Sequence, residues 1–161
     1  MQDKKILFVC LGNICRSPAA EAITKKYLTD ENLQDKIFVD SAGTAGYHIG
    51  QTADPRMIKH ASARGYTLDH IARKFSAAKD FPEFDYIITM DNQNFEDIKS
   101  LDHINKFSNK IFKMADFCRN IKIEEVPDPY YEGAAGFENV LDILEDGCKG
   151  IIEKLKNNAL N

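Results

Sequence analysis

The fold of this chain is decided by residues 4–18, which read KKILFVCLGNICRSP. Residues 4–10 form a short run of apolar and β-branched side chains, as is typical of a parallel strand that is buried on both faces. Gly12 and Asn13 follow in a loop, and both residue types tolerate positive φ. Ser17 and Pro18 then predict an N-cap and a first helical position, with an Ala-rich helix running to about Leu28.

The rest of the chain repeats this alternation of strand and helix. Strands are expected at 37–39, 84–90 and 110–114, with a turn-rich stretch at 40–46. Asp54-Pro55 and Asp91 predict the starts of two helices, the first of which closes at Gly65. A last helix is marked by apolar residues at helical spacing, namely Phe137, Val140, Leu141, Leu144, Cys148, Ile151, Ile152 and Leu155. The pattern predicts one α/β domain over residues 1–161, with a parallel sheet covered by helices on both faces and Cys148 in its core.

Composition and charge exclude several classes of function. The chain has 161 residues and a formal net charge of −4, so it lacks the broad basic surface expected of a nucleic-acid-binding protein. The sequence contains no apolar run long enough to span a membrane, and the apolar stretch near its start is too short to be expected to act as a signal peptide. Its four cysteines, at 10, 15, 118 and 148, do not have the spacing of zinc ligands, so no metal site is predicted. Reduced thiols and a cytoplasmic location are expected.

The chemistry is concentrated in the loop that joins Cys10 to Arg16. A Cys and an Arg at this spacing are a weak signal alone, but this loop leaves the carboxyl end of a strand and enters a helix. Backbone N–H groups converge at such a place and form an anion site. The converging amides and Arg16 favour the thiolate form of Cys10 over the thiol, and the Ser17 hydroxyl can donate to it. Because Arg16 also offers a planar fork for two oxygens, the loop indicates phosphoryl transfer through a thiophosphate.

Phosphoryl transfer to a cysteine also requires an acid for the leaving oxygen. The best candidate is Asp128, which stands between two prolines and is followed by Tyr130 and Tyr131. The prolines hold the carboxyl rigidly, and the tyrosines could flank an aromatic substrate. Taken without the loop, Asp-Pro is more simply interpreted as a turn.

Together, the segments 9–18 (VCLGNICRSP) and 128–131 (DPYY) resemble the signature segments of the low molecular weight protein tyrosine phosphatases. Their order, spacing and chain length also match, so the resemblance covers essentially the whole chain. It implies a three-layer, flavodoxin-like fold with a four-stranded parallel sheet in the order 2-1-3-4. It also implies hydrolysis of phosphotyrosine and aryl phosphate esters without a metal or any other cofactor.

The resemblance assigns the catalytic roles to three residues. Cys10 resembles the nucleophile, Arg16 the clamp on the transition state, and Asp128 the acid that protonates the tyrosyl oxygen and then activates water. Phosphotyrosine proteins are the implied substrates, and inorganic phosphate or another oxyanion is the implied product or inhibitor. A monomer is favoured, with no nucleic-acid or membrane partner.

The resemblance also assigns residues that surround the three catalytic groups. Ser17 matches a hydroxyl that stabilises the thiolate, and Asn13 matches a strained residue held by Ser41 and His70. Without the family, His70 would be interpreted as a surface histidine. The phosphate-binding loop comprises Leu11, Gly12, Asn13, Ile14, Cys15 and Ser17, and the slot for the phosphotyrosine ring comprises Leu11, Ile14, Tyr47, Tyr130 and Tyr131. Position 47 often carries Trp in this family.

Cys15 has two interpretations. In the family, the matching cysteine can form a reversible bridge to the nucleophile and protect it from further oxidation. Alternatively, Cys15 packs under the loop. The bridge is the favoured interpretation.

Three rival functions are weighed against this prediction. An arsenate reductase of the same fold also needs a cysteine pair on a mobile segment, and the corresponding residues 75–88 contain no cysteine. A protein arginine phosphatase carries Thr where this chain has Ile14. A non-catalytic phosphate-binding module would be expected to lack Cys10, Arg16 or Asp128, and all three are present.

Overall fold

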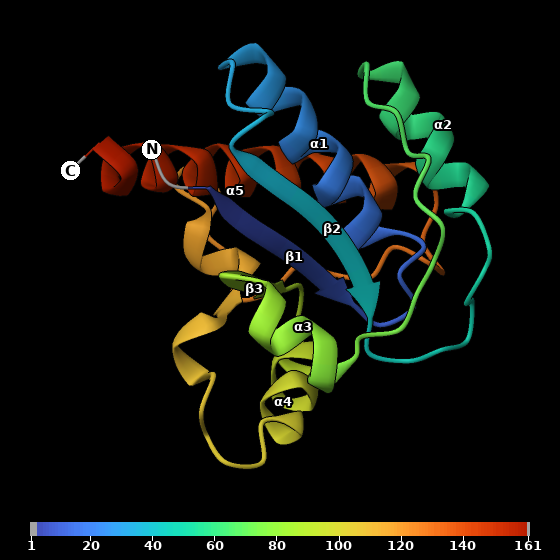
Figure 1. Cartoon of the computed structure of the whole chain (residues 1–161). Coiled ribbons are helices and arrows are strands. Elements are labelled where there is room, and N and C mark those ends of the chain that lie inside the picture. Colours follow the sequence, from blue (N-terminus) through green and yellow to red (C-terminus); the bar gives the residue numbers. More distant parts are fainter. Residues whose placement is uncertain (1–2, 161) are drawn as a thin grey trace.

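A computed structural model describes residues 3–160 and contains one four-stranded sheet. All neighbouring strands are parallel, and their order is β2-β1-β3-β4, which confirms the predicted order and fold class. The strands are β1 (Lys4–Cys10), β2 (Ile37–Gly43), β3 (Tyr86–Thr89) and β4 (Ile111–Lys113). Because β1 is central, the loop that follows it opens at the middle of the sheet's carboxyl edge (Figure 1).

Helices cover both faces of this sheet (Figure 1). They are α1 (Arg16–Asp30), α2 (Pro55–Ala63), α3 (Ala77–Glu83), α4 (Asn92–Leu101) and α5 (Ala134–Leu160), with short 3₁₀ helices η1 (Ser108–Lys110) and η2 (Met114–Phe117). None of the helices among the described residues combines the length and the apolar character that crossing a bilayer requires.

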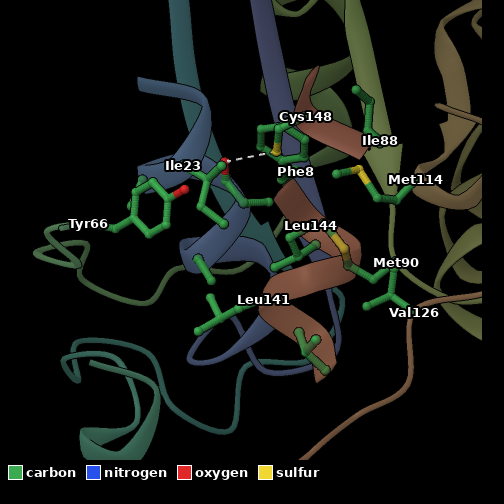
Figure 2. Close-up of a cluster of buried hydrophobic side chains, with 14 of the residues drawn as sticks. Phe8, Ile23, Tyr66, Ile88, Met90, Met114, Val126, Leu141, Leu144 and Cys148 are labelled. Atoms are coloured by element: carbon green, nitrogen blue, oxygen red, sulfur yellow. Dashed lines mark hydrogen bonds between the residues drawn. The ribbon is translucent and has the colours of Figure 1, made fainter. Parts of the chain in front are cut away.

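The larger half of the core lies between the sheet, α1 and α5. Phe8 and Ile88 point from the sheet toward Leu144 and Cys148 of α5 (Figure 2). Cys148 is fully buried, and its sulfur accepts a hydrogen bond from the Thr24 hydroxyl at 3.2 Å. The prediction that Cys148 is a core residue is therefore confirmed.

The smaller half of the core lies on the opposite face. The alternate residues of β1, Leu7 and Val9, pack there with Phe81 of α3 and Ile98 of α4. Alternation of side chains along one buried strand thus supplies both halves of the core, as expected for a parallel strand covered on two faces.

Two predicted element boundaries beside the loop were wrong. β2 continues through residues 40–43, predicted to be a turn, because Ala42 and Gly43 extend the parallel pairing as far as Val9 and Cys10. Helix α1 begins at Arg16 rather than Pro18, and no side chain caps it. The Ser17 hydroxyl is not a cap because it has other partners, described below.

The other predicted helix starts are confirmed. Asp54 caps α2 by accepting a hydrogen bond from the Arg56 amide, and Pro55 occupies the first helical position. The turn after α2 closes at Gly65, whose φ is 89°. Asp91 caps α4.

Candidate active site

The loop between β1 and α1 forms the floor of a pocket of about 290 Å³. Segments that are far apart in the sequence supply its walls: the 47–48 region after β2 and the 128–131 region before α5. The lining residues are Cys10, Leu11, Gly12, Ile14, Cys15, Arg16, Tyr47, His48, Asp128, Tyr130 and Tyr131. Every residue that the sequence assigned to catalysis or to the slot is therefore in one place.

The end of β2 lies unusually close to the loop. Thr44 and Ala45 donate backbone hydrogen bonds to the carbonyls of Cys10 and Leu11, both at 2.9 Å. A Cβ atom on Gly43 would stand 2.8 Å from the Leu11 carbonyl oxygen and 3.2 Å from the Asn13 nitrogen. Only glycine fits here without a shift of the backbone, so Gly43 fixes the path of the loop against β2.

Asn13 is the centre of the loop's internal hydrogen bonding. Its φ is 59°, a left-handed conformation that asparagine tolerates better than most residues. The Arg73 amide donates to Asn13 Oδ1 at 2.9 Å, which identifies that atom as the carbonyl oxygen. The side-chain nitrogen must therefore donate, and it does so to the hydroxyls of Ser17 at 2.8 Å and Ser41 at 3.0 Å.

These bonds determine where the two hydroxyl protons point. Ser41 donates to the buried carboxylate of Glu21 at 2.7 Å. Ser17, whose oxygen already accepts from Asn13, lies 3.0 Å from Cys10 Sγ. A hydroxyl that accepts on one side offers its proton on the other, so the Ser17 proton faces the Cys10 sulfur.

His70 supports Asn13 from outside the loop. Its Nε2 lies 2.8 Å from Asn13 Oδ1, and its Nδ1 lies 3.1 Å from Glu21 Oε1. The ring therefore bridges the Asn13 side chain and the buried carboxylate of Glu21. The interpretation of His70 as a plain surface histidine is wrong.

Glu21, Asp40 and His70 offer three ligand atoms within 4.8 Å of one another, an arrangement that could hold a metal ion. Their charges already have protein partners, however. Asp40 accepts from Arg73 Nε at 3.1 Å, and Glu21 accepts from Lys25. The cluster is thus satisfied by cationic side chains, with His70 between the two carboxylates.

Arg16 is 2% exposed, and two of its three guanidinium nitrogens contact other residues. Nη1 donates to Asp91 at 2.8 Å and to the Val126 carbonyl at 3.0 Å, and Nη2 lies 3.5 Å from Asp128. Burial by itself would lower the pKa of Arg16, but the negative charge of Cys10 and the Asp91 hydrogen bond outweigh it and raise the pKa. Arg16 is therefore a permanent cation beside the Cys10 sulfur.

Asp128 is presented from a segment anchored at Val126. The Val126 amide donates to the Met90 carbonyl beyond β3, while its own carbonyl accepts from Arg16. The Asp128 side chain is 43% exposed and accepts from the Tyr130 amide at 3.1 Å. The carboxyl group is therefore held at the mouth of the pocket rather than buried in its floor.

The two cysteines of the loop have different surroundings. Burial strongly raises the pKa of Cys15, and the negative charges of Cys10, Asp54 and Asp128 raise it further. Cys15 therefore stays a thiol at neutral pH, whereas Cys10 faces both Arg16 and the Ser17 hydroxyl. All four cysteines are free in the structure.

Comparison with known proteins extends these observations. A family model described as low molecular weight phosphotyrosine protein phosphatase matches residues 5–160. The chain belongs to this phosphatase family. A crystal structure of a protein tyrosine phosphatase from Entamoeba histolytica is 51% identical, with a TM-score of 0.91, and 98% of this chain and 99% of that chain are covered.

Two further relatives of this low molecular weight phosphatase show the range of the family. A low molecular weight phosphotyrosine protein phosphatase from Gallus gallus is 40% identical over 94% of this chain and 95% of that protein. The crystal structure of a Drosophila arginine phosphatase is 34% identical, with a TM-score of 0.87, over 94% of this chain and 98% of that chain. The predicted family is confirmed.

Sequence reasoning missed several residues that contact the predicted ones. Glu21, Arg73 and Asp91 each make a hydrogen bond to a loop residue or to a residue that holds the loop, and His48 lines the pocket over Gly12. Of these residues, only Asp91 was marked in the sequence, where it was predicted to cap a helix. That structural role accounted for the residue fully, so nothing in the sequence was a reason to place Asp91 in the site. The other contacts join segments that the sequence does not relate to one another.

Proposed function

We propose that this phosphatase hydrolyses phosphotyrosine in proteins through a cysteinyl-phosphate intermediate, with Cys10 as the nucleophile. The observation that carries the proposal is the directed set of hydrogen bonds that ends on Cys10 Sγ, with buried Arg16 beside it. This arrangement favours a thiolate and provides a cationic fork for the oxygens of a phosphoryl group.

In the first step, the Cys10 thiolate attacks phosphorus and the bond from phosphorus to the tyrosyl oxygen breaks. Asp128 gives its proton to that oxygen, so tyrosine leaves as a neutral phenol. Arg16 and the backbone N–H groups of the loop hold the three remaining oxygens of the transferred group. The position of Asp128 at the mouth of the pocket suits an atom that leaves toward solvent.

In the second step, water attacks the phosphorus of the cysteinyl phosphate. Asp128, now a carboxylate, takes a proton from that water, and the sulfur leaves as a thiolate. The Ser17 hydroxyl stabilises the departing thiolate through the contact at 3.0 Å. The products are inorganic phosphate and the starting enzyme, so the cycle needs neither a metal nor a cofactor.

The walls of the pocket favour a long aromatic stem. Leu11 and Tyr47 are exposed by 40% and 74%, and Tyr130 and Tyr131 pack edge to face with centroids 5.0 Å apart. A phosphotyrosine ring can pass between these groups and deliver its phosphate to the floor, which a shorter phosphoserine would not reach. Ile14 offers no polar group for a guanidinium, so phosphotyrosine is preferred to phosphoarginine.

Two further aspects of the proposal concern regulation and place of action. Peroxide would convert the Cys10 thiolate to a sulfenic acid, which Cys15 would then attack to form a disulfide with release of water. A thiol reductant restores both cysteines. We infer that the enzyme works in the cytoplasm, where such reductants are available, and as a monomer.

The test is turnover of a phosphotyrosine peptide in EDTA, with phosphoserine and phosphoarginine peptides and arsenate as comparisons. Hydrolysis should be confined to phosphotyrosine and abolished in Cys10→Ser, while that variant still binds inorganic phosphate. Cys118→Ser, which changes a half-buried cysteine outside the pocket, is the control and should be fully active. Substantial turnover by Cys10→Ser, or a preference for phosphoarginine, would refute the proposal.

A further inference from the structure

Charge is distributed unevenly along this acidic chain. Residues 99–122 carry a formal net charge of +4, so the remainder of the chain carries −8. The segment runs from the end of α4 through η1, β4 and η2, and it therefore surrounds the edge strand β4. The segment has two acidic residues. Asp102 is buried and accepts hydrogen bonds from the amides of Lys106 and Phe107, so Asp116 is the one exposed carboxylate of the segment.

Five lysines around this edge have no acidic partner. Among the residues that the structure describes, none of their ammonium groups lies within 4.0 Å of a carboxylate oxygen, which is also true of other lysines such as Lys26 and Lys59, whereas Lys5, Lys25 and Lys156 are paired. We call these five residues the lysine face: Lys99, Lys106, Lys110, Lys113 and Lys154.

Aromatic rings position the ammonium groups of the lysine face. Lys99 and Lys113 both lie over the Phe95 ring, at 5.4 and 4.8 Å from its centroid. In the same way, Lys106 and Lys110 lie over the Phe107 ring at 5.5 and 5.4 Å from its centroid, and Lys110 also donates a hydrogen bond to the Phe81 carbonyl at 2.8 Å. Cation–π contacts hold the side chains in place without neutralising them, so the positive charge remains available to an external anion.

An apolar tip adjoins these charges. Leu101, the last residue of α4, is 37% exposed, and Ile104 in the connection that follows is 77% exposed. Asn105 beside them has φ of 55°, so the chain turns sharply at this point. Large apolar side chains projecting from a turn next to lysines are the combination that binds an interfacial membrane surface.

We propose that the lysine face and the tip at Leu101 and Ile104 bind the surface of a bilayer containing anionic phospholipids. Lipid phosphates and carboxylates would meet the unpaired ammonium groups, and Ile104 would enter the boundary between headgroups and acyl chains. An acidic protein would satisfy the lysines but would need its own pocket for a projecting isoleucine, whereas a fluid bilayer accommodates one anywhere. The prediction of no membrane partner considered spanning segments and total charge, and neither describes this local surface.

Such binding would leave the catalytic pocket open. Helix α4 begins after Asp91, which contacts Arg16, and its ten residues run away from the pocket to Leu101. The tip therefore lies beyond the far end of α4, where the yellow loop is seen at the bottom of Figure 1. Binding at the tip and substrate entry can occur together, so this proposal does not depend on the proposed reaction.

The experiment is cosedimentation of the full chain with vesicles of phosphatidylcholine alone and with vesicles that also contain phosphatidylserine. Binding should require phosphatidylserine and weaken at high salt. Lys99→Gln/Lys106→Gln removes two exposed charges and should weaken binding about 25-fold. Ile104→Ser should weaken it about tenfold, because the apolar insertion is lost.

The matched control is Lys26→Gln/Lys59→Gln, which removes two exposed lysines from α1 and α2 on the other side of the sheet. It should bind like the unaltered chain, and all variants should hydrolyse a soluble aryl phosphate equally. Three results would overturn the proposal: no sedimentation with phosphatidylserine vesicles, equal weakening by the control, or binding unaffected by Ile104→Ser. Retention on polyglutamate or RNA without vesicle binding would instead assign the lysine face to an acidic macromolecule.

Discussion

Gly43→Ala should disturb the catalytic loop although position 43 contributes no side chain to the site. The added methyl group would lie 2.8 Å from the Leu11 carbonyl and 3.0 Å from the Ala45 carbonyl, and both obstacles are backbone atoms. An ordinary contact begins at about 3.4 Å, so the loop or β2 must move by about half an ångström. Crowding of this kind costs about 1–3 kcal/mol, and the stiffer unfolded chain offsets up to about 1 kcal/mol. We therefore expect a net destabilisation of about 1–2 kcal/mol.

The loss of activity should exceed what the loss of stability explains. A small displacement of the amides that face phosphate should lower kcat at least about tenfold, even where the variant is fully folded. Urea unfolding would measure the stability, and steady-state hydrolysis of an aryl phosphate would measure kcat. Gly133→Ala is the control, because a methyl group at Gly133 meets no atom within 4 Å and should change neither quantity. If Gly43→Ala retains the kcat of Gly133→Ala, Gly43 does not fix the path of the loop.

The remaining predictions concern Asp128 and Cys15. Asp128→Asn should slow phosphotyrosine hydrolysis by roughly 10²–10⁴, and by less for a phenol that leaves easily, since such a phenol needs less help from a proton. Equal losses for both substrates in single turnover would make Asp128 structural. Because burial raises the pKa of Cys15, iodoacetate near neutral pH should modify Cys10 before Cys15, as peptide mapping would reveal. After peroxide treatment, Cys15→Ser should regain less activity with thiol than the unaltered enzyme, and equal recovery would mean that Cys15 only packs under the loop.

The sequence was sufficient to predict those strands and helices whose pattern of apolar residues lies within the element itself. Residues 4–10 are apolar at every position after the two lysines, so a buried central strand was predictable. The stripe from Phe137 to Leu155 likewise predicted most of α5. The end of β2 was not predictable, because residues 40–43 look like a turn and become a strand only by pairing with β1.

Site residues were predictable where their contacts lie close together in the sequence, and were not predictable where the contacts join distant segments. Cys10 and Arg16 lie on one loop, and the roles proposed for them follow from charge and geometry there. Ser17 was predicted both as a helix cap and as a donor to Cys10; the folded loop places it beside Cys10 and adds Asn13 as its second partner, and it does not cap the helix. The contact of His70 with Asn13 spans 57 positions, and only the resemblance to a family anticipated it.

The guanidinium of Arg16 divides its contacts between the protein and the space that a phosphate would fill. Nη1 is committed to Asp91 and to the Val126 carbonyl, so an incoming dianion must draw on Nε and Nη2, and Nη2 is the nitrogen that faces Asp128. One buried side chain would thus anchor the segment that carries Asp128 and receive the phosphate as well. The distance between the phosphate and the Asp128 carboxyl group is therefore set by a single residue, so neither can be displaced without the other.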